Sequence, residues 1–225
     1  MGSISHLPEL GADPEREYRL GIMGGTFDPI HNGHLMLGHA AYETFSLDQI
    51  WFMPNGMPPH KKQSSIESDI HERIAMTQIA IKANKQFYLQ EYEAKREKVS
   101  YSYKTMEHFR KMYPDDEYYF IIGADSLFSI ETWKHPERLF KACIILAACR
   151  DEAATKESLN GQIQMLKGKY GAYIKFLAMP LEHVSSHEIR KLIESGEPVS
   201  EYIPAEVEAY IRKEGLYGSG NRKNQ

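Results

Sequence analysis

The chain lacks the features that mark membrane and disulfide-linked proteins. Its longest apolar run, residues 142–149, is far too short to span a bilayer, and no basic start followed by an apolar block marks a secretory leader. Only two cysteines occur, Cys143 and Cys149. Six positions apart in one strand, they are too distant to bond each other and lack metal-ligand spacing. We therefore expect a cytoplasmic protein without membrane contact, with both cysteines in its core.

An excess of positive charge is also missing. The net charge of −4 argues against a nucleic-acid partner, since affinity for polyanions comes mostly from neutralised phosphates. There is no low-complexity stretch and no repeat of solenoid period, and 225 residues can bury a full core as one domain. The polar start, punctuated by Pro and Gly, predicts a flexible lead-in over residues 1–17. A single domain is expected over residues 18–217, and a disordered tail over 218–225.

Short β-rich runs alternate with helical patterns along the domain. Strands are expected near residues 19–23, 50–53, 87–90, 118–122, 143–147 and 173–177, and helices over 33–45, 70–83, 101–112, 136–141 and 158–169 and from Ser186 and Pro204. Gly196 and Gly215 are expected to end the last two helices. This alternation predicts an α/β fold with a doubly wound parallel sheet and a small C-terminal helical region. Ligands of such sheets bind beyond the carboxyl ends of the strands.

The segment GGTFDPIHNGH, residues 24–34, directly follows the first expected strand. Glycines at a strand-to-helix junction let backbone N–H groups approach an anion, and the following helix points its positive end to the same place. His31 and His34 lie one helical turn apart, so both imidazoles can face that anion as donors. Alone, a Gly-Gly pair fits any tight turn, and two such histidines fit a surface or a helix cap. Together they predict a phosphate site with cationic imidazoles.

A second segment, VSSHEIR at residues 184–190, also has the features of an anion site. Ser185 or Ser186 can cap the helix that follows. Arg190 lies near the first turn of that helix, so a guanidinium and a helix N-terminus can bind the same anion.

These two segments resemble motifs of the nucleotidylyltransferase superfamily. The first resembles its HxGH signature and the second its C-terminal ISSTxIR element. Between them, PPHK at 58–61, SYS at 100–102 and IGADSL at 122–127 with Trp133 resemble the nicotinate mononucleotide adenylyltransferase branch, and the match runs from about Arg19 to Tyr217. The resemblance implies a Rossmann-like fold. It also implies an enzyme of NAD biosynthesis that transfers the adenylyl group of ATP to nicotinate mononucleotide, giving deamido-NAD and pyrophosphate.

The resemblance further implies roles for single residues. Catalytic roles fall on His31, His34 and Arg190. ATP contacts are implied for these three and for Gly24, Gly25, Thr26, Phe27, Gly33, Arg150, Ser185 and Ser186, and mononucleotide contacts for Lys61, Ser102, Gly123, Asp125 and Trp133. The indole of Trp133 would stack on the pyridinium ring, for which an aromatic face is suited. The chain departs from the family pattern at His187, where Ser or Thr is usual, and at Ser102, where Thr is usual.

The implied chemistry requires positioning and charge more than proton transfer. The attacking phosphate is already anionic at neutral pH, so no general base is needed. Charge spreads over the α-phosphate and the leaving pyrophosphate in the transition state, where preformed donors stabilise it. Mg²⁺ can arrive with the phosphates of ATP and keep most of its waters, so no dedicated metal site is expected in the protein.

Several alternatives stay open on the sequence. Phosphopantetheine adenylyltransferases usually have Thr where His31 stands, and cytidylyltransferases differ in the second motif; both lack the Asp125 to Trp133 arrangement. A dinucleotide-binding oxidoreductase would need G-x-G-x-x-G, and a zinc hydrolase a third ligand beside His31 and His34. A non-catalytic nucleotide sensor would bind ATP and release no pyrophosphate. A homo-oligomer is compatible with the sequence, and residues 91–98 are expected to form a solvated loop of mixed charge.

Overall fold

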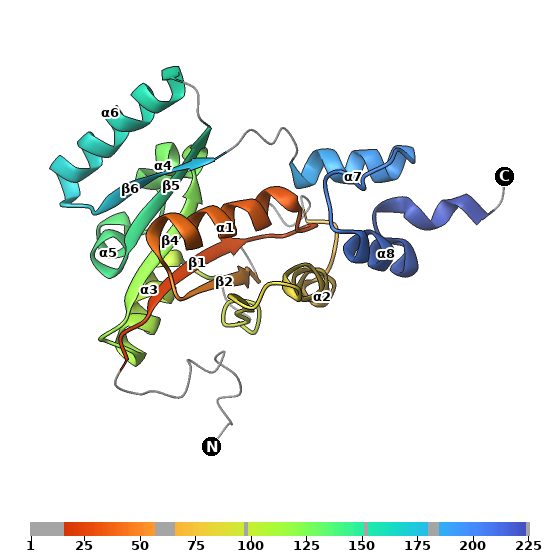
Figure 1. Ribbon diagram of the computed structural model, residues 1–225, viewed down its shortest axis with the longest axis horizontal. Helices are drawn as coiled ribbons and strands as arrows, with labels where there is room; N and C mark the ends of the chain where they lie inside the picture. The colour runs from red at the N-terminus through yellow and green to blue at the C-terminus, as the bar shows by residue number, and fades with distance from the viewer. Residues whose placement is uncertain (1–15, 57–65, 97–98, 151–152, 180–184, 224–225) are drawn as a thin grey trace.

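The computed structural model describes residues 16–56, 66–96, 99–150, 153–179 and 185–223. Within them, six strands form one sheet: β1 (Arg19–Gly25), β2 (Gln49–Pro54), β3 (Phe87–Leu89), β4 (Glu117–Gly123), β5 (Ile144–Arg150) and β6 (Ile174–Met179). Their order is β3-β2-β1-β4-β5-β6, and every neighbouring pair is parallel (Figure 1). This order belongs to a doubly wound Rossmann-type sheet, so the expected fold class is confirmed.

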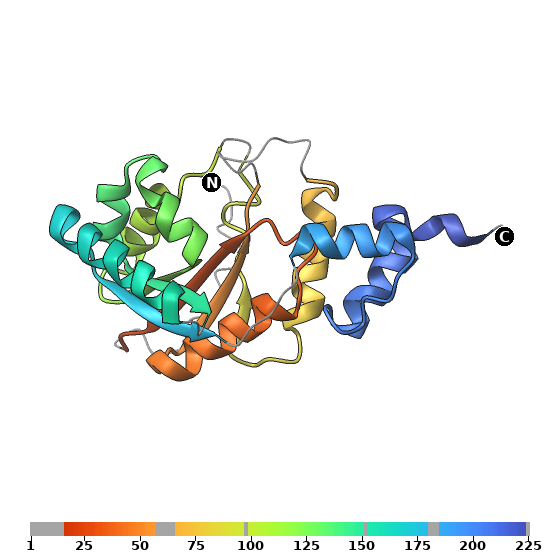
Figure 2. The same cartoon turned by 90° about the horizontal axis from the view of Figure 1, so that it is seen from above.

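Helices cover both faces of the sheet, which therefore forms the middle of three layers (Figure 2). The α-helices are α1 (Asn32–Phe45), α2 (Ile70–Ile81), α3 (Ser102–Met112), α4 (Ala124–Ser129), α5 (Pro136–Ala142), α6 (Ala153–Tyr170), α7 (Ser186–Ser195) and α8 (Ala205–Glu214); two 3₁₀ helices are η2 (Ile130–Thr132) and η3 (Leu216–Lys223). Residues of α1, α2, α7 and α8 share one apolar cluster, and residues of α3, α4, α5 and α6 share the other.

Alternation along each strand explains the two clusters. Tyr118 and Phe120 of β4 belong to one cluster, whereas Tyr119 and Ile121 belong to the other. Successive side chains of a strand point to opposite faces, and a parallel sheet covered by helices buries both. Every residue of β2 is accordingly buried.

Local signals account for most of the helix ends. Asp69 caps α2 by accepting from the backbone N–H groups of His71 and Glu72. Gly196 and Gly215 follow α7 and α8 with φ of 83° and 67°, a left-handed conformation that glycine adopts without steric cost. These two predicted helix ends are confirmed.

The structure also differs from the expected elements. Helix α4 and η2 were not expected, and α6 begins at Ala153 rather than near Ser158. Leu216–Lys223 is a 3₁₀ helix where we expected the domain to end at 217 and a tail to follow. The division into lead-in, domain and tail itself stays a prediction.

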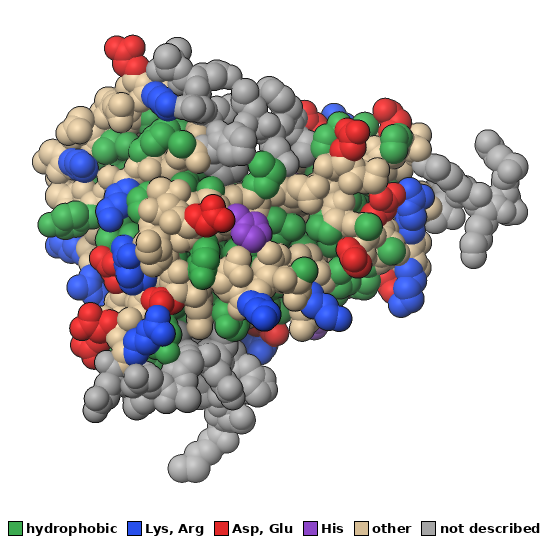
Figure 3. All heavy atoms as spheres, in the orientation of Figure 1, with side chains coloured by type: hydrophobic (Ala, Val, Ile, Leu, Met, Phe, Trp, Pro, Cys, Tyr) green, Lys and Arg blue, Asp and Glu red, His purple; other side chains and the backbone are tan. Residues whose placement is uncertain are grey.

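Charge and apolar surface are distributed without a dominant patch on the face seen in Figure 3. There, among the described residues, Lys and Arg side chains alternate with Asp and Glu. No helix in the described ranges is long and apolar enough to cross a membrane. Cys143, just before β5, and Cys149, within it, are both buried, as expected.

Candidate active site

A cleft of about 690 Å³ opens at the carboxyl ends of the strands. It lies where the strand order reverses between β1 and β4, the usual place for a ligand in a doubly wound sheet. Among the predicted site residues that line it are Gly24, Gly25, Thr26, His34, Ser102, Gly123 and Trp133. The structure therefore brings residues from the first motif and from the middle of the chain to one cavity, whose size suits a nucleotide-sized ligand.

The rings of His31 and His34 lie against each other, tilted by 39°, at the start of α1. Their ring centroids lie 3.8 Å apart, and the backbone N–H of His31 donates to Nδ1 of His34 at 3.2 Å. Because this bond needs Nδ1 without a proton, the neutral ring of His34 carries its proton on Nε2. Phe27 packs edge-on against the same ring, with centroids 5.0 Å apart. The loop thus fixes both the orientation and the tautomer of His34.

His31 is buried, and its burial favours the neutral ring. The residue is 9% exposed, and its Nδ1 makes no hydrogen bond with the described residues. Burial lowers the pKa of His31 from the ordinary 6.5 to about 4. The expectation of two cationic imidazoles therefore does not hold for His31 in this structure, because burial disfavours the charged ring. A bound phosphate could supply both the missing partner and the favourable charge.

This shifted pKa predicts a loss of stability in acid. The unfolded chain takes up a proton near pH 6.5 and the folded state only near pH 4, so the contribution of His31 is present above pH 6.5 and lost as the pH falls towards 4. At full size it equals roughly 3 kcal/mol, at about 1.4 kcal/mol per pKa unit. We expect His31→Gln to flatten this part of the curve in urea unfolding between pH 7 and pH 4. His71→Gln, at an exposed site on α2, is the control. If stability fell equally steeply with pH in both variants, the acid sensitivity could not be assigned to His31.

The glycine loop owes its sequence to packing as well as to anion binding. A Cβ on Gly25 would lie 2.7 Å from the ring of Phe27, which no side chain tolerates. Phe27 itself has φ of 51° and is 1% exposed. Gly25 thus leaves room for the ring that orients His34, and the buried ring of Phe27 shapes the loop.

Arg73 holds the glycine loop through hydrogen bonds to backbone carbonyls, a role that was not predicted from the sequence. It is 2% exposed, and its Nη1 donates to the carbonyls of Thr26 at 2.7 Å and Asn55 at 2.8 Å. Burial lowers the pKa of Arg73, and the negative charge of Asp28 acts against this shift. The residue lies on the face of α2 that carries the buried Met76 and Ala80. A charged residue on the apolar stripe of a helix is the signal that could have revealed it.

The second motif reaches the first through Arg190 and Ser186. The Nη1 of Arg190 donates to the carbonyl of Asp28 at 2.7 Å, and Ser186 Oγ donates to the carbonyl of Pro29 at 2.9 Å. Arg190 Nε also donates to Glu67 at 2.7 Å. The structure thus joins two motifs that lie about 150 residues apart in the sequence.

The N-terminus of α7 is capped as its sequence predicts. Ser185 Oγ accepts from the backbone N–H of Glu188, and the Glu188 carboxylate accepts from Ser185 in return. This capping box occupies part of the first turn of α7. Any ATP contact of Ser185 stays a prediction.

The other end of the cleft carries Ser102 and Trp133. Ser102 begins α3, and the partly buried Trp133 packs edge-on against Phe120 with centroids 6.5 Å apart. Glu93 also lines this end, although we expected residues 91–98 to be solvated. It is 6% exposed and accepts from Thr105 Oγ1 at 2.7 Å, and burial raises the pKa of its carboxyl. That expectation is wrong for Glu93 because the loop folds over α3.

Nine predicted site residues are not among those that line the cavity: Phe27, His31, Gly33, Lys61, Asp125, Arg150, Ser185, Ser186 and Arg190. Asp125 is exposed in the first turn of α4 and Gly33 lies in the first turn of α1, and neither is among the residues that line the cavity. Arg150 ends β5 with its side chain outside the described residues, and Lys61 lies outside them altogether. Within the described ranges, no group of three His, Cys, Asp or Glu residues could hold a metal ion.

Known proteins resemble this chain over most of its length. Residues 22–192 match the cytidylyltransferase-like family. A protein of Lachnoclostridium phytofermentans named "Probable nicotinate-nucleotide adenylyltransferase" is 40% identical over 199 residues, which cover 88% of this chain and 98% of the relative. A protein of the same name from Carboxydothermus hydrogenoformans is 41% identical, with the same coverage.

The fold also has a counterpart among solved structures. The nicotinic acid mononucleotide adenylyltransferase of Plasmodium falciparum, solved in complex with NaAD, superposes with a TM-score of 0.72. The match covers 90% of this chain and 98% of that one, at 21% sequence identity. At this identity the likeness concerns the fold.

Proposed function

The chain belongs to the cytidylyltransferase-like family, and from this premise we propose that it transfers the adenylyl group of ATP to nicotinate mononucleotide, releasing pyrophosphate and forming deamido-NAD. It is a nicotinate-nucleotide adenylyltransferase of NAD biosynthesis. One observation carries the proposal: His34, fixed by His31 and Phe27, lines a cleft that also holds the glycine loop at one end and Trp133 at the other. Such a cleft can hold two nucleotides with their phosphates meeting at the histidines.

The histidines and the loop stabilise the charge of the transition state. The phosphate of the mononucleotide attacks the α-phosphorus of ATP, the bond to the β-phosphate oxygen breaks, and pyrophosphate leaves with the electron pair. Nε2–H of His34 donates to the α-phosphate, and a ring N–H of the buried His31 donates beside it. Because these donors are already held in place, they require no reorganisation as charge develops.

Arg190 and the start of α7 bind the outer phosphates of ATP. Arg190 is 8% exposed, and a guanidinium held in a dry site binds a phosphate strongly. Its Nε donates to Glu67, which fixes the orientation of the guanidinium. Ser185 and Ser186 frame the same helix end.

A divalent cation accompanies the reaction without a protein cage. Mg²⁺ enters on the phosphates of ATP and neutralises part of their charge when bound. Because ATP is its substrate, we place the enzyme in the cytoplasm. A homo-oligomer stays a prediction.

Product analysis tests the proposal directly. Pyrophosphate release is measured with Mg²⁺ and ATP in parallel reactions containing nicotinate mononucleotide, nicotinamide mononucleotide or phosphopantetheine, and products are separated by chromatography. We expect strong preference for nicotinate mononucleotide and a deamido-NAD product. Turnover with phosphopantetheine alone would move the chain to another branch, and ATP binding without turnover would make it a nucleotide sensor.

Trp133 is expected to set the affinity for the mononucleotide. If its indole stacks on the pyridinium ring, Trp133→Ala should raise KM for nicotinate mononucleotide about tenfold, from a stacking energy of about 1–2 kcal/mol. KM for ATP should stay unchanged, and Trp133→Phe, which keeps an aromatic face, should show a smaller effect. Steady-state kinetics with each substrate varied in turn measures both constants. An unchanged KM for the mononucleotide would remove the stacking role.

A further inference from the structure

The C-terminal end of the domain reaches back to the first motif through Tyr217. This residue is 9% exposed, and its hydroxyl donates to Oδ1 of Asp28 at 2.7 Å. Ser68 Oγ in turn donates to the Tyr217 hydroxyl at 2.7 Å. Because the phenol oxygen accepts from Ser68, its own proton is directed at Asp28. Burial raises the pKa of Tyr217, so it remains a donor throughout the working pH range.

Asp28 joins four distant parts of the chain. Its side chain is 2% exposed and accepts from the backbone N–H groups of Glu67 at 2.8 Å and Ser68 at 3.2 Å, besides the bond from Tyr217. The guanidinium of Arg190 bonds to its carbonyl at 2.7 Å and lies 3.7 Å from its carboxylate. A single buried charge thus connects the glycine-histidine loop, the start of α2, α7 and the C-terminal segment.

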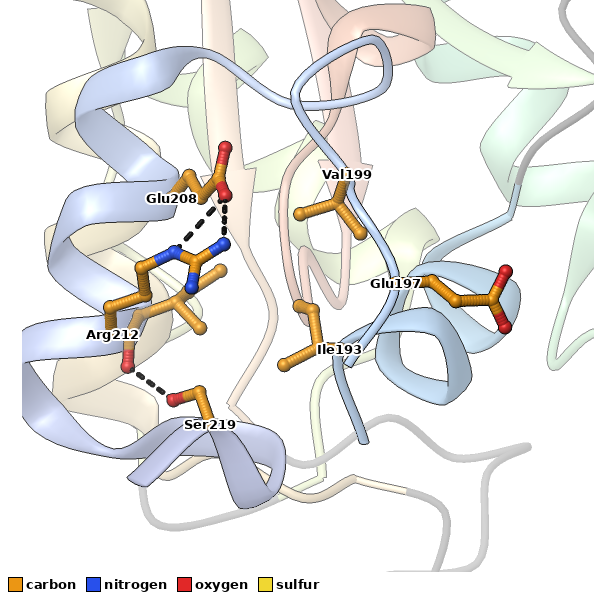
Figure 4. Close-up of a pocket in the computed structure, with 7 residues that line it drawn as sticks. Ile193, Glu197, Val199, Glu208, Arg212 and Ser219 are labelled. Carbon is orange, nitrogen blue, oxygen red and sulfur yellow. Dashed lines mark hydrogen bonds and ion pairs between the residues drawn. The ribbon is translucent and has the colours of Figure 1, made fainter. Parts of the chain in front are cut away.

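Helix α8 fixes the position of Tyr217. Ser219 Oγ of η3 donates to the carbonyl of Ile211 in α8 at 3.0 Å, and Glu208 and Arg212 pair one turn apart on that helix (Figure 4). Tyr217 has φ of 54°, so the chain turns sharply at this residue, within η3. The phenol is therefore held by the packing of the C-terminal helices rather than by the loop that it supports.

The hydroxyl of Tyr217 determines how strongly the Asp28 carboxylate attracts the guanidinium of Arg190. The Asp28 carboxylate accepts from three neutral donors, the Tyr217 hydroxyl and two backbone N–H groups. It therefore needs no direct bond from Arg190, which lies 3.7 Å away, and the guanidinium can still bind a ligand. Within the described residues, Nη2 of Arg190 makes no hydrogen bond. Without the phenol, a buried carboxylate short of a donor draws the guanidinium towards itself, because unpaired charge is costly in a dry site.

We propose that Tyr217 is a positioning residue for ATP, which holds Asp28 so that Arg190 stays available to the phosphates of the nucleotide. The inference rests on the proposed function, in which Arg190 binds ATP. It assigns to the C-terminal 3₁₀ segment a role in substrate binding, beyond closing the apolar core.

Tyr217→Phe removes the hydroxyl and keeps the ring. We expect KM for ATP to rise about fivefold or more, as for a lost hydrogen bond to a charged group, while KM for nicotinate mononucleotide changes less than about twofold. Tyr210→Phe is the matched control, since this tyrosine of α8 packs against the same apolar cluster and its hydroxyl has no hydrogen bond among the described residues. It should leave both constants unchanged.

A merely structural role would give a different result. If Tyr217→Phe lowers the melting temperature but leaves KM for ATP unchanged, or raises both KM values equally, the proposal fails. In an Arg190→Gln background, Tyr217→Phe should cause no further rise in KM for ATP, and an additive rise would overturn the route through Arg190. Ser68→Ala removes only the hydroxyl that donates to Tyr217. It should give a smaller rise in KM for ATP and again leave KM for nicotinate mononucleotide nearly unchanged.

The same variants separate this inference from the proposed function. Absence of pyrophosphate release by the wild-type protein would refute the adenylyltransferase activity alone. Calorimetric titration with Mg²⁺ and ATP would still test the positioning role, because Tyr217→Phe should weaken ATP binding by about the same factor as KM. Equal dissociation constants for wild type, Tyr217→Phe and Tyr210→Phe would overturn the inference.

Discussion

Replacing His34 by alanine is expected to lower kcat more than 100-fold while the protein stays folded. Losing one preorganised donor to a developing oxyanion typically has an effect of this size. His34 lines the cleft and is partly exposed, so its removal leaves no buried cavity. Steady-state kinetics gives kcat, and circular dichroism with thermal melting checks the fold. Near-normal turnover would refute the assigned role.

The structure also predicts which replacement retains activity. Because Nδ1 of His34 accepts from the backbone of His31, catalysis depends on Nε2–H. Glutamine can place an amide N–H near the position of Nε2, whereas the shorter asparagine reaches only the position of Nδ1. His34→Gln should therefore retain more activity than His34→Asn, which should resemble His34→Ala. The reverse order would place the catalytic proton on Nδ1.

The fold could be predicted from local pattern because its strands and long helices carry strong signals. Six apolar runs separated by helical patterns gave the parallel sheet, and Gly196 and Gly215 marked two helix ends. Helices α4 (Ala124–Ser129) and η2 (Ile130–Thr132) were not predicted, because they are too short to show a full helical period of apolar positions. Short elements of this kind are fixed by tertiary packing, which a single sequence does not reveal.

Site residues within a contiguous motif could be predicted from the sequence. Polar residues that contact each other only in the fold could not. His31, His34 and Arg190 stand in two short segments, and the structure joins these segments. Glu93 and Tyr217 gave no such signal. Glu93 lies in a run of alternating charge that usually faces solvent, and Tyr217 is separated from Asp28 by 189 positions. Burial of a polar group depends on elements that arrive from elsewhere in the chain.

Asp28→Ala is expected to be the most destabilising single change in the loop. It leaves the hydroxyl of Tyr217 and two backbone N–H groups without an acceptor, and it removes the negative charge facing Arg190 and Arg73. Breaking a buried ion pair in this way typically costs about 3–5 kcal/mol. For a chain of this size the melting temperature should fall by roughly 10 °C, at about 2–4 °C per kcal/mol.

Comparison with Asp28→Asn separates the charge from the hydrogen bonds. Asparagine keeps one acceptor for Tyr217 but places an NH₂ group against the backbone N–H of Glu67, so it should cost less than alanine and still destabilise. Asp115→Ala, at an exposed position beyond the opposite end of the sheet, should stay within about 0.5 kcal/mol of wild type in urea unfolding. If Asp28→Ala lowered the free energy of unfolding by less than about 1 kcal/mol, the carboxylate would not be needed to hold these segments together. Arg190 would then owe its position to the packing of α7 alone, and ATP binding should survive the substitution.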